Sequence, residues 1–502
     1  MNTLVLVVGA GPVGLTMAMA LRHRGVDVRI IDKCPAPTDK SKALVLWPRT
    51  LELLDIHACS QVFVDAGLKA TGAHIMADGQ TLAKIALDAV HSDFRYVVMI
   101  PQNETERLLG EQLGKVDVHV ERSVELTSFT EDGDGVSAVL QHADGRAETV
   151  RASYLIACDG AHSTVRHGLG ATFEGDTLPS NWVLADLELD GDCPGHEITI
   201  AFTPDGVMAI FPIGGKRFRI IADVELLPEG SPQDPSLEDI QALLDHRGPS
   251  GLRAHDPIWI SRFRINERKV KDYRHGRVFL AGDAAHVHSP AGGQGMNTGM
   301  QDAFNLAWKL AMVWHGQAVA SLLDTYSPER SAIGDQVLRN AGNLTRLALI
   351  RNPILREIRR LAAGALGHIA AMRQRMADQL SEVDLHYPDS ALTQSPHGAA
   401  HHPAGGDRAR DVALSHGEHG ATRLHEILAT GKFAVLSVGA ARMDLPESLQ
   451  SIATVVEANG VPDYESGHVY LIRPDAYVAM STSGSDTGAI VAALKRLAPG
   501  GD

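Results

Sequence analysis

The chain has 502 residues, of which 44% are hydrophobic and 21% are charged. This ordinary globular mixture excludes a disordered, collagen-like or coiled-coil protein, and the length predicts about three domains. Asp and Glu number 61 against 46 Lys and Arg, which gives a formal charge of −15 and disfavours binding to nucleic acid or to anionic membranes.

Residues 3–32 predict a βαβ unit. An apolar run over residues 3–8 is typical of a strand covered on both faces, and a helical stretch follows to about residue 24. A second apolar run over residues 26–31 predicts another strand, which ends at Asp32. Two strands joined by a helix in so short a stretch are typical of a dinucleotide-binding domain.

A glycine-rich turn joins the first strand to the helix. Gly9 permits a tight turn, Gly11 lets the backbone approach a pyrophosphate, and Gly14 allows the helix to pack closely on the strand. The helix start offers partial positive charge to phosphates, and Asp32 can accept bonds from ribose hydroxyls. We therefore predict a nucleotide site that includes Gly9, Gly11, Pro12, Val13, Gly14, Asp32 and Lys33.

The middle of the chain predicts a second kind of sheet. Residues 116–158 alternate apolar and polar positions between turn clusters, and residues 181–225 repeat this pattern. Such alternation predicts antiparallel strands in a layer distinct from the βαβ unit. A strand over residues 277–280 precedes a helix over residues 299–314, and residues 338–380 predict a long helical region.

Three motifs distinguish between the dinucleotides that such a turn can bind. Residues 155–166 read Leu-Ile-Ala-Cys-Asp-Gly-Ala-His-Ser-Thr-Val-Arg, and residues 278–286 read Val-Phe-Leu-Ala-Gly-Asp-Ala-Ala-His. Residues 289–297 read Ser-Pro-Ala-Gly-Gly-Gln-Gly-Met-Asn. In order and spacing these segments resemble the DG motif, the GD motif and the flavin-proximal loop of single-component flavin-dependent aromatic hydroxylases, in their phenol hydroxylase and polyketide hydroxylase branch. On this resemblance we call residues 289–297 the flavin loop.

The resemblance implies an α/β fold with a Rossmann-like FAD-binding domain, an inserted antiparallel-sheet substrate domain and a small thioredoxin-like C-terminal domain. The expected boundaries are residues 1–180 and 271–387 for the FAD-binding domain, with residues 70–100 contributing to the substrate side, residues 181–270 for the substrate sheet, residues 388–410 for a linker rich in Pro, Gly, His and Ser, and residues 411–502 for the C-terminal domain. That last domain contains no cysteine, which excludes a thioredoxin-like redox role.

The resemblance also extends the predicted cofactor-binding set. The added residues are Lys42, Gln102, Asp159, Gly160, Arg166, Gly282, Asp283, Pro290, Gly293, Gly295, Met296 and Asn297. Asp283 would accept bonds from the ribityl hydroxyls of FAD, although it can also cap the next helix. Backbone amides near Met296 and Asn297 would stabilise negative charge on reduced flavin. Arg166 would contact the phosphates of the nicotinamide cofactor or form a structural salt bridge.

Lys42 departs from the family pattern, because many relatives have an arginine at this place. Lysine keeps the positive charge but loses the bidentate fork of a guanidinium. The role of that arginine in positioning the flavin therefore cannot be assigned to Lys42 from the resemblance. Arg49, at the head of the following helix, would compensate for the change or lie on the surface.

The resemblance implies an NAD(P)H-dependent flavoprotein monooxygenase. NAD(P)H would bind transiently and reduce the flavin, because the single dinucleotide turn is assigned to FAD. Reaction with O2 would give a C4a-hydroperoxyflavin, whose oxygen passes to a phenolic or polycyclic aromatic ring. We expect no indispensable nucleophile, and Pro290 and Gly293 of the flavin loop are the candidates for residues beside the chemistry.

The substrate is expected between the flavin loop and the antiparallel sheet, in a pocket that excludes water. Candidate wall residues are Met208, Ile210, Phe211, Pro212, Pro290, Ala291 and Gly292, of which the four sheet residues fit an ordinary core equally well. Three alternatives stay open: a Baeyer–Villiger or epoxidising oxygenase on the same scaffold, a flavin dehydrogenase or oxidase, and a FAD-binding protein without turnover.

Cysteine and histidine usage adds further expectations. The four cysteines form no CxxC pair, and no apolar run is long enough for a membrane span. We therefore expect a soluble cytoplasmic protein, a monomer or a homodimer, with neither nucleic-acid nor membrane partners. His286 and His288 are two residues apart but lack an evident third ligand, so we predict no metal site.

Overall fold

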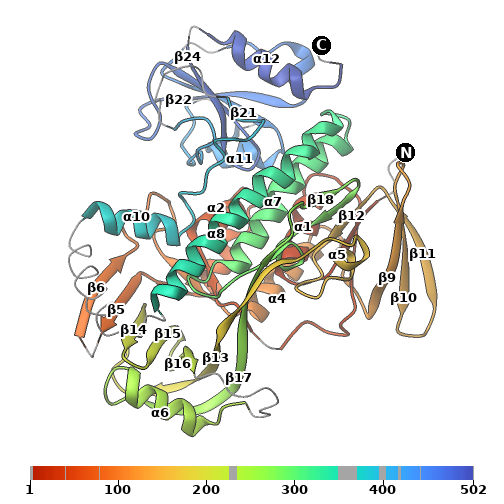
Figure 1. Ribbon diagram of the computed structural model, residues 1–502. Coiled ribbons are helices and arrows are strands. Elements are labelled where there is room, and N and C mark those ends of the chain that lie inside the picture. The colour runs from red at the N-terminus through yellow and green to blue at the C-terminus, as the bar shows by residue number, and fades with distance from the viewer. Residues whose placement is uncertain are drawn as a thin grey trace.

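The nucleotide-side sheet is a mostly parallel sheet at the centre of the molecule (Figure 1). We describe it, and the rest of the fold, from a computed structural model over residues 4–39, 41–77, 80–224, 234–348, 370–394, 403–415, 420–440, 443–484 and 486–500. The strands, in spatial order, are β18 (Arg274–His275), β19 (Val278–Leu280), β12 (Tyr154–Ala157), β1 (Val5–Val8), β2 (Val28–Asp32) and β8 (Glu121–Arg122). Only the pairing of β18 with β19 is antiparallel.

Helix α1 (Pro12–Arg22) packs on this sheet, and two further helices pack on α1 and so fix where the motifs lie. They are α4 (Gln102–Gly114) and α7 (Gly295–Trp314). Helix α7 packs closely on α1, because Gly282 and Gly299 leave room for Val13: a Cβ on either glycine would lie 2.7 Å from Val13 Cγ2. The close packing brings the flavin loop, which leads into α7, next to the glycine-rich turn.

An eight-stranded sheet forms the lower layer in Figure 1. Its strands, in spatial order, are β20 (His286–Val287), β17 (Arg253–Lys269), β13 (Glu174–Asp190), β16 (Arg217–Val224), β15 (Gly206–Gly214), β14 (Glu197–Thr203), β5 (Gly72–Ala77) and β6 (Gln80–Ala86). Helix α6 (Leu237–Arg247) packs on one face through Ile240 and Leu244. The strands β13 and β17 extend from this layer to the nucleotide-side sheet (Figure 1).

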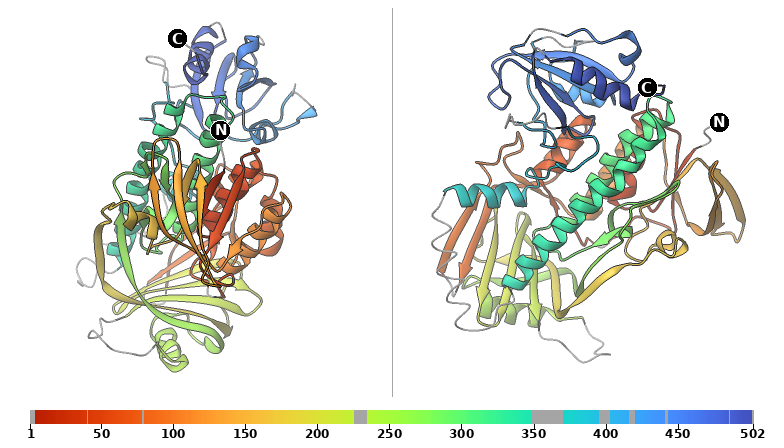
Figure 2. Two further views of the ribbon diagram at one scale, coloured as in Figure 1. Left: turned by 90° about the vertical axis from the view of Figure 1, so that its right-hand side faces the viewer. Right: turned by 45° about the horizontal axis from the view of Figure 1, so that its top comes forward.

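Two smaller sheets lie beside these layers. The first joins β3 (Val45–Leu46), β7 (Val97–Met99) and β4 (Leu68–Ala70). Helices α2 (Pro48–Ile56) and α3 (Ser60–Ala66) lie between β3 and β4 in the chain. The second, of β9 (Val124–Glu131), β10 (Val136–His142) and β11 (Ala147–Ala152), projects beside the N-terminus, with α5 (Thr164–Gly168) packed near it (Figure 2). These sheets connect segments that are distant in the sequence.

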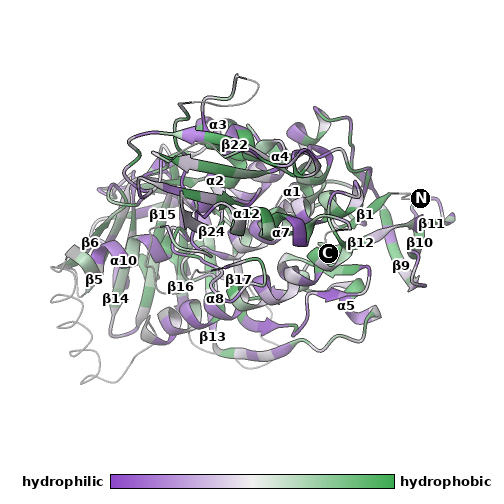
Figure 3. Cartoon of the chain, turned by 90° about the horizontal axis from the view of Figure 1, so that it is seen from above, coloured by the Kyte–Doolittle hydropathy of each residue, from purple (hydrophilic) through white to green (hydrophobic). Residues whose placement is uncertain are grey.

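The C-terminal unit stands above α7 and α8 (Tyr326–Ala348) in Figures 1 and 2. Its four strands, in spatial order, are β22 (Ala453–Ala458), β21 (Phe433–Val438), β23 (His468–Ile472) and β24 (Val478–Ser483), with helices α11 (Leu424–Ala429) and α12 (Gly488–Leu497). The strands are largely hydrophobic (Figure 3). The ring of Phe433 packs edge-on against Trp308 of α7 at a centroid distance of 5.5 Å, so this unit shares a core with the rest of the chain.

The structure differs from the sequence predictions in detail. Helix α7 begins at Gly295 instead of residue 299, because the glycines of the flavin loop accommodate its first turn. The helical region predicted over residues 338–380 contains the end of α8 and α10 (Ala370–Leu380), while residues 349–369 lie outside the described residues, as does part of the linker. Within the described part of the chain, no helix is long and apolar enough to cross a membrane.

Candidate active site

The sequence-predicted motifs meet at one edge of the nucleotide-side sheet. Asp32 ends β2, the glycine-rich turn follows β1, the DG motif follows β12 and the GD motif follows β19. These four strands are neighbours and run parallel, so their carboxyl ends lie side by side. In open α/β sheets, ligands bind outside the carboxyl ends of the strands. We call this region the cofactor edge.

The glycine-rich turn is shaped by contacts that no side chain would allow. A Cβ on Gly9 would lie 2.4 Å from the Cys158 oxygen, and one on Gly14 would lie 1.9 Å from the Gly9 oxygen. Gly11 differs, because no atom lies within 4 Å of the place where its Cβ would stand. Its open side faces the start of α1, where the first N–H groups have no partner within the helix. The turn therefore offers space and positive potential to an anionic group.

Asp32 fastens the glycine-rich turn to the second strand. Its Oδ2 accepts a hydrogen bond of 2.7 Å from the backbone N–H of Ala10, and its Oδ1 accepts one of 2.8 Å from Cys34. A carboxylate oxygen has two lone pairs, so both oxygens retain capacity for a ligand hydroxyl. The side chain of Lys33, the next predicted residue, is exposed.

The DG motif leaves a buried acceptor without a partner. Asp159 Oδ2 accepts from the Val165 N–H at 3.3 Å, whereas its buried Oδ1 has no hydrogen-bond partner. Burial raises the pKa of this carboxyl. Gly160 has a φ of +81° and open space where a Cβ would stand. An unpartnered buried acceptor beside open space is typical of a site that a ligand completes.

Arg166 has a different environment from the one predicted for it. The side chain is buried, and its guanidinium donates to the backbone oxygens of Ala284 at 3.1 Å and Ala161 at 2.7 Å. It also stacks on the Phe173 ring, 4.0 Å from the centroid. Arg166 thus ties the DG motif to the GD motif through carbonyl oxygens. These contacts leave it little exposed to the phosphates of a nicotinamide cofactor.

The GD motif places Asp283 in a recess. Its side chain is exposed. Loss of hydration nevertheless raises the pKa of its carboxyl group, and the nearby charges of His286 and Lys42 only partly offset this rise. A carboxyl group that is open to solvent and yet largely surrounded by protein is suited to contact a bound ligand. Lys42 itself is exposed, and its charge acts on Asp283 from another segment of the chain.

The backbone that carries Lys42 is held by a buried ion pair. Arg219 Nε donates to Asp186 Oδ1 at 2.6 Å, and the same guanidinium donates to the carbonyl oxygens of Ser41 at 2.6 Å and Lys42 at 2.9 Å. Gln102, also predicted as a cofactor contact, accepts from the backbone N–H of Ala43 at 3.1 Å. Sequence reasoning did not identify the Arg219–Asp186 pair, because nothing local connects these residues to residue 42.

The flavin loop is fixed by Asn297 and Trp47. The Asn297 amide donates to the oxygens of Val45 at 2.9 Å and Gly293 at 3.0 Å, and its oxygen accepts from the Trp47 N–H at 2.9 Å. The Trp47 indole donates to the Gly292 oxygen at 2.9 Å. Gly292 and Gly293 have φ values of +90° and +64°, which favour glycine. Trp47 is a further residue of the site that the sequence did not reveal.

The rest of the flavin loop lies close to the start of α7. Pro290 is exposed, whereas Ala291, Gly295 and Met296 are half-buried. His288, just before the loop, donates from Nδ1 to the Ser289 oxygen at 2.9 Å, and its buried Nε2 has no partner. Burial, helped by the charge of His286, lowers the pKa of His288 to about 4.

The predicted wall of the substrate pocket requires a correction. Met208 and Ile210 are wholly buried in β15 and pack in the core beneath α6, and the alternation of the strand places the buried Pro212 on that same side. These three residues face away from the flavin loop and do not line a pocket beside it. Phe211 points to the opposite face and is half-buried.

The face that carries Phe211 is apolar and adjoins the flavin loop. We call it the apolar face; it consists of Val45, Trp47, Ile75, Ile200, Phe211, Ile213, Met376 and Leu380. Most of these side chains are only partly buried. Trp47 belongs to this face and also bonds the loop, so the two regions are contiguous.

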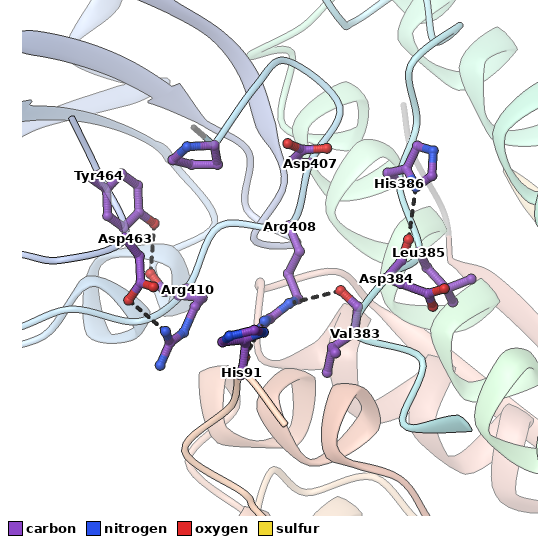
Figure 4. Close-up of a pocket in the computed structure, with 11 residues that line it drawn as sticks. His91, Val383, Asp384, Leu385, His386, Asp407, Arg408, Arg410, Asp463 and Tyr464 are labelled. Carbon is purple, nitrogen blue, oxygen red and sulfur yellow. Dashed lines mark hydrogen bonds and ion pairs between the residues drawn. The ribbon is translucent and has the colours of Figure 1, made fainter. Parts of the chain in front are cut away.

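A cavity of about 300 Å³ lies elsewhere, where the C-terminal unit meets the body of the protein (Figure 4). It is lined by His91, Val383, Asp384, Leu385, His386, Pro403, Asp407, Arg408, Arg410, Asp463 and Tyr464. Most of its charged groups are paired within the chain, for example Arg410 with Asp463 at 2.6 Å. The residues predicted for the cofactor and the substrate do not line it.

The features of the cofactor edge fit a dinucleotide with a polar ring system. Gly11 and Gly160 provide open backbone, Asp159 Oδ1 needs a donor, and Asp283 is accessible. Helix α7 begins at Gly295, within the flavin loop, and the first amides of a helix have no partner inside the helix. Acceptors for hydroxyl groups and donors for anionic groups thus occur together.

Comparisons with known proteins agree with this geometry. The family model described as "FAD binding domain" matches residues 2–341, and the one described as "Aromatic-ring hydroxylase, C-terminal" matches residues 402–498. The chain is 34% identical to 6-methylpretetramide 4-monooxygenase of Streptomyces rimosus, over 98% of this chain and 93% of that protein. It is 31% identical to pentachlorophenol 4-monooxygenase of Sphingobium chlorophenolicum, over 82% and 76% respectively.

Among solved structures, the anhydrotetracycline hydroxylase from Streptomyces rimosus superposes with a TM-score of 0.81 and 31% identity over 99% of both chains. An aromatic hydroxylase from angucycline biosynthesis superposes with a TM-score of 0.79 and 30% identity over 96% of both chains. The similarity therefore includes the C-terminal unit as well as the two central sheets.

Proposed function

The chain belongs to the family of FAD-dependent aromatic-ring hydroxylases, and we propose that its substrate is a polycyclic aromatic compound that lies on the apolar face. The protein is an NAD(P)H-dependent flavoprotein monooxygenase that hydroxylates a phenolic or polycyclic aromatic substrate. Its named relatives support hydroxylation over the Baeyer–Villiger, dehydrogenase and non-catalytic alternatives.

The cofactor edge supplies the contacts that we propose for FAD. The start of α1 and the open side of Gly11 would bind the pyrophosphate, and Asp32 would accept from the adenosine ribose. Asp283 would accept from the ribityl hydroxyls, and Asp159 Oδ1 would gain its missing donor from the same ligand. FAD, when bound, supplies the redox chemistry that activates O2.

Helix α7 and Lys42 would hold the flavin ring. The first amides of α7, near Met296 and Asn297, would stabilise negative charge on the reduced ring. Lys42 stands where its charge already acts on Asp283, and the Arg219–Asp186 pair fixes its backbone. We propose that this rigid support compensates for the missing arginine fork.

The single observation that carries the substrate proposal is the contiguity of the apolar face with the flavin loop through Trp47. Half-buried Ile75, Ile200, Phe211 and Ile213 present apolar surface that a large aromatic molecule would cover. Covering it would exclude water from the reacting ring. The relatives named for tetracycline-type compounds and for angucycline biosynthesis match this chain over nearly its whole length, and their names support a substrate of several fused rings.

The test is the rate of NADPH oxidation by the FAD-loaded protein with simple phenols and with fused-ring phenols. We expect the fused-ring compounds to accelerate oxidation more and to yield a product that has gained one oxygen atom. Phe211→Ala should raise the KM for the fused-ring substrate about tenfold, since burying a large aromatic side chain against a ligand contributes about 1–2 kcal/mol.

Ile258→Ala is the matched control, because Ile258 is an exposed apolar residue of the same sheet and its loss should leave KM unchanged. An equal effect of the two variants, or an equal response to simple and fused-ring phenols, would contradict the proposed substrate class.

A further inference from the structure

Glu382 is a buried acid with an unusual backbone, in the turn that follows α10. Its side chain is fully buried, and its φ is +61°. A non-glycine residue in this left-handed region persists where the surrounding structure holds it there. The last turn of α10 contacts the flavin loop, because the Gln379 oxygen accepts from Gln294 Nε2 at 3.0 Å. The turn after α10 contacts α2, because the Ser381 oxygen accepts from the Arg49 N–H at 3.2 Å.

The carboxyl group of Glu382 is directed at the first two turns of α7. Gln301 Nε2 donates to Oε2 at 2.6 Å, and Oε1 lies 3.3 Å from the Thr298 hydroxyl. That hydroxyl also lies 3.0 Å from the Gln294 oxygen, which can only accept. The Thr298 hydroxyl has one proton for two acceptors, the Gln294 oxygen and Glu382 Oε1, and the Gln294 oxygen is the nearer of the two. A proton on the carboxyl group would allow Glu382 to donate to Thr298 while the hydroxyl donates to the Gln294 oxygen.

The charges around Glu382 do not compensate an ionised carboxylate. From α8, Arg330 acts on it, but the Arg330 guanidinium is bonded to Asp302 at 2.6 Å. From its own turn, Asp384 repels a negative charge. Within the described part of the chain, no ion pair joins Glu382 to a basic side chain. Burial dominates and raises the pKa of Glu382 to about 8.

We propose that Glu382 is a positioning residue that, in its protonated form, donates to Thr298 and accepts from Gln301, and so holds the start of α7 in place for FAD. This inference rests on the proposed function, which sets the flavin ring against the first turn of α7. When Glu382 ionises, the donation to Thr298 is lost and an unpaired charge is buried beside the helix. FAD affinity therefore depends on the proton at this residue.

The test is the dissociation constant of FAD, measured by flavin fluorescence from about pH 6 to about pH 10, for the wild type and for Glu382→Gln. Glutamine retains a donor and an acceptor at every pH. In the wild type, the dissociation constant should stay level below about pH 8 and rise by up to about tenfold per pH unit above it. In Glu382→Gln it should stay level throughout, and parallel curves would overturn the proposal.

Asp384→Asn is the matched control. It removes a neighbouring carboxyl whose charge raises the pKa of Glu382, so the rise should persist and start at a lower pH. Failure of both wild type and variants to bind FAD at any pH would contradict the proposed function, whereas pH-independent binding by the wild type would contradict only the role of Glu382.

A second measurement detects the proton on Glu382 directly and does not require bound FAD. Infrared spectroscopy of the wild-type protein near neutral pH should show the carbonyl band of a protonated, buried carboxyl group, which disappears as the pH is raised through about 8. The difference spectrum against Glu382→Gln assigns the band. A spectrum without such a band at neutral pH would overturn the proposal.

Discussion

The cofactor edge and the junction with the C-terminal unit are both rich in polar groups, but they use them differently. At the cofactor edge, Asp159 Oδ1 and His288 Nε2 are buried without partners. At the junction, Glu329 accepts from Lys309 at 2.7 Å and from both terminal nitrogens of Arg473 at 2.8 and 2.9 Å. A buried carboxylate oxygen that lacks a donor can be completed by a ligand, whereas a buried carboxylate that the chain's own cations satisfy serves the fold.

The direction of the pKa shifts separates the two regions in the same way. At the cofactor edge, burial raises the pKa of Asp159 and Asp283, and the hydrogen bonds to Asp159 and the charges near Asp283 do not reverse this. At the junction, burial opposes ionisation of Glu329, but the charges of Arg473 and Lys309 outweigh it and hold its pKa below the usual range. The charge of Glu329 is therefore balanced by its own neighbours in the chain, whereas the carboxyl groups of Asp159 and Asp283 lack such a balance.

Glu329→Gln should have the largest effect of the changes that test this comparison. It leaves Arg473 and Lys309 as buried charges without a full counter-charge, which costs about 3–5 kcal/mol. We expect a matching loss in the free energy of unfolding by urea, with little change in the FAD dissociation constant of the folded protein.

Asp324→Asn is the control for that variant, because the Asp324–Arg274 pair is exposed and such pairs contribute about 0–1 kcal/mol. If Glu329→Gln weakened FAD binding and left stability unchanged, the junction would not be a purely structural region.

Asp283→Asn should have the second-largest effect, and this effect should appear at the cofactor edge. Loss of charged hydrogen bonds to a hydroxyl-bearing ligand costs about 1.5–3 kcal/mol, or roughly 10- to 100-fold in FAD affinity. Stability without FAD should be unchanged or higher, because a carboxyl disfavoured by its surroundings is removed. Titration calorimetry and urea unfolding measure the two quantities. A large loss of stability with unchanged FAD affinity would reverse the assignment.

Gly11→Ala should have the smallest effect on the fold. It tests whether the open space at Gly11 is needed for ligand binding and not for packing. Gly11 has a φ of −76°, which alanine adopts without strain, so stability should be kept or raised by about 0.4–1 kcal/mol. The added methyl group would occupy the open side of the turn and weaken FAD binding about tenfold.

Gly14→Ala is the counterpart in the same turn, where a Cβ would lie 1.9 Å from the Gly9 oxygen. That variant should be destabilised with or without FAD. Equal stability of the two alanine variants would show that the openness at Gly11 has no functional meaning.

The parts of this site that the sequence predicts are local ones. The strands before Gly9, Asp159 and Gly282 are short apolar runs that end in a motif, so their carboxyl ends could be predicted to gather at one edge of the sheet. The wall of the substrate pocket could not be predicted in this way. Alternation along β15 separates Met208 from Phe211, but the sequence does not indicate which face α6 covers.

The other residues of the site could not be predicted from the sequence, because their partners are distant in the chain. Trp47 bonds a carbonyl at Gly292, and Arg219 bonds a carbonyl at Lys42. Glu382 is an ordinary acid in the sequence and becomes special only by burial against α7. Backbone carbonyls carry no residue-specific signal, so only the folded arrangement reveals such contacts.

The central claim is that the cofactor edge is completed by FAD, and that oxygen is transferred from there to an aromatic ring on the apolar face. The most direct measurement is turnover of the FAD-loaded protein with NADPH, a fused-ring phenol and isotopically labelled O2, followed by mass analysis of the product. We predict one labelled oxygen atom in the ring product. Label found only in hydrogen peroxide, with the aromatic compound unchanged, would contradict the account.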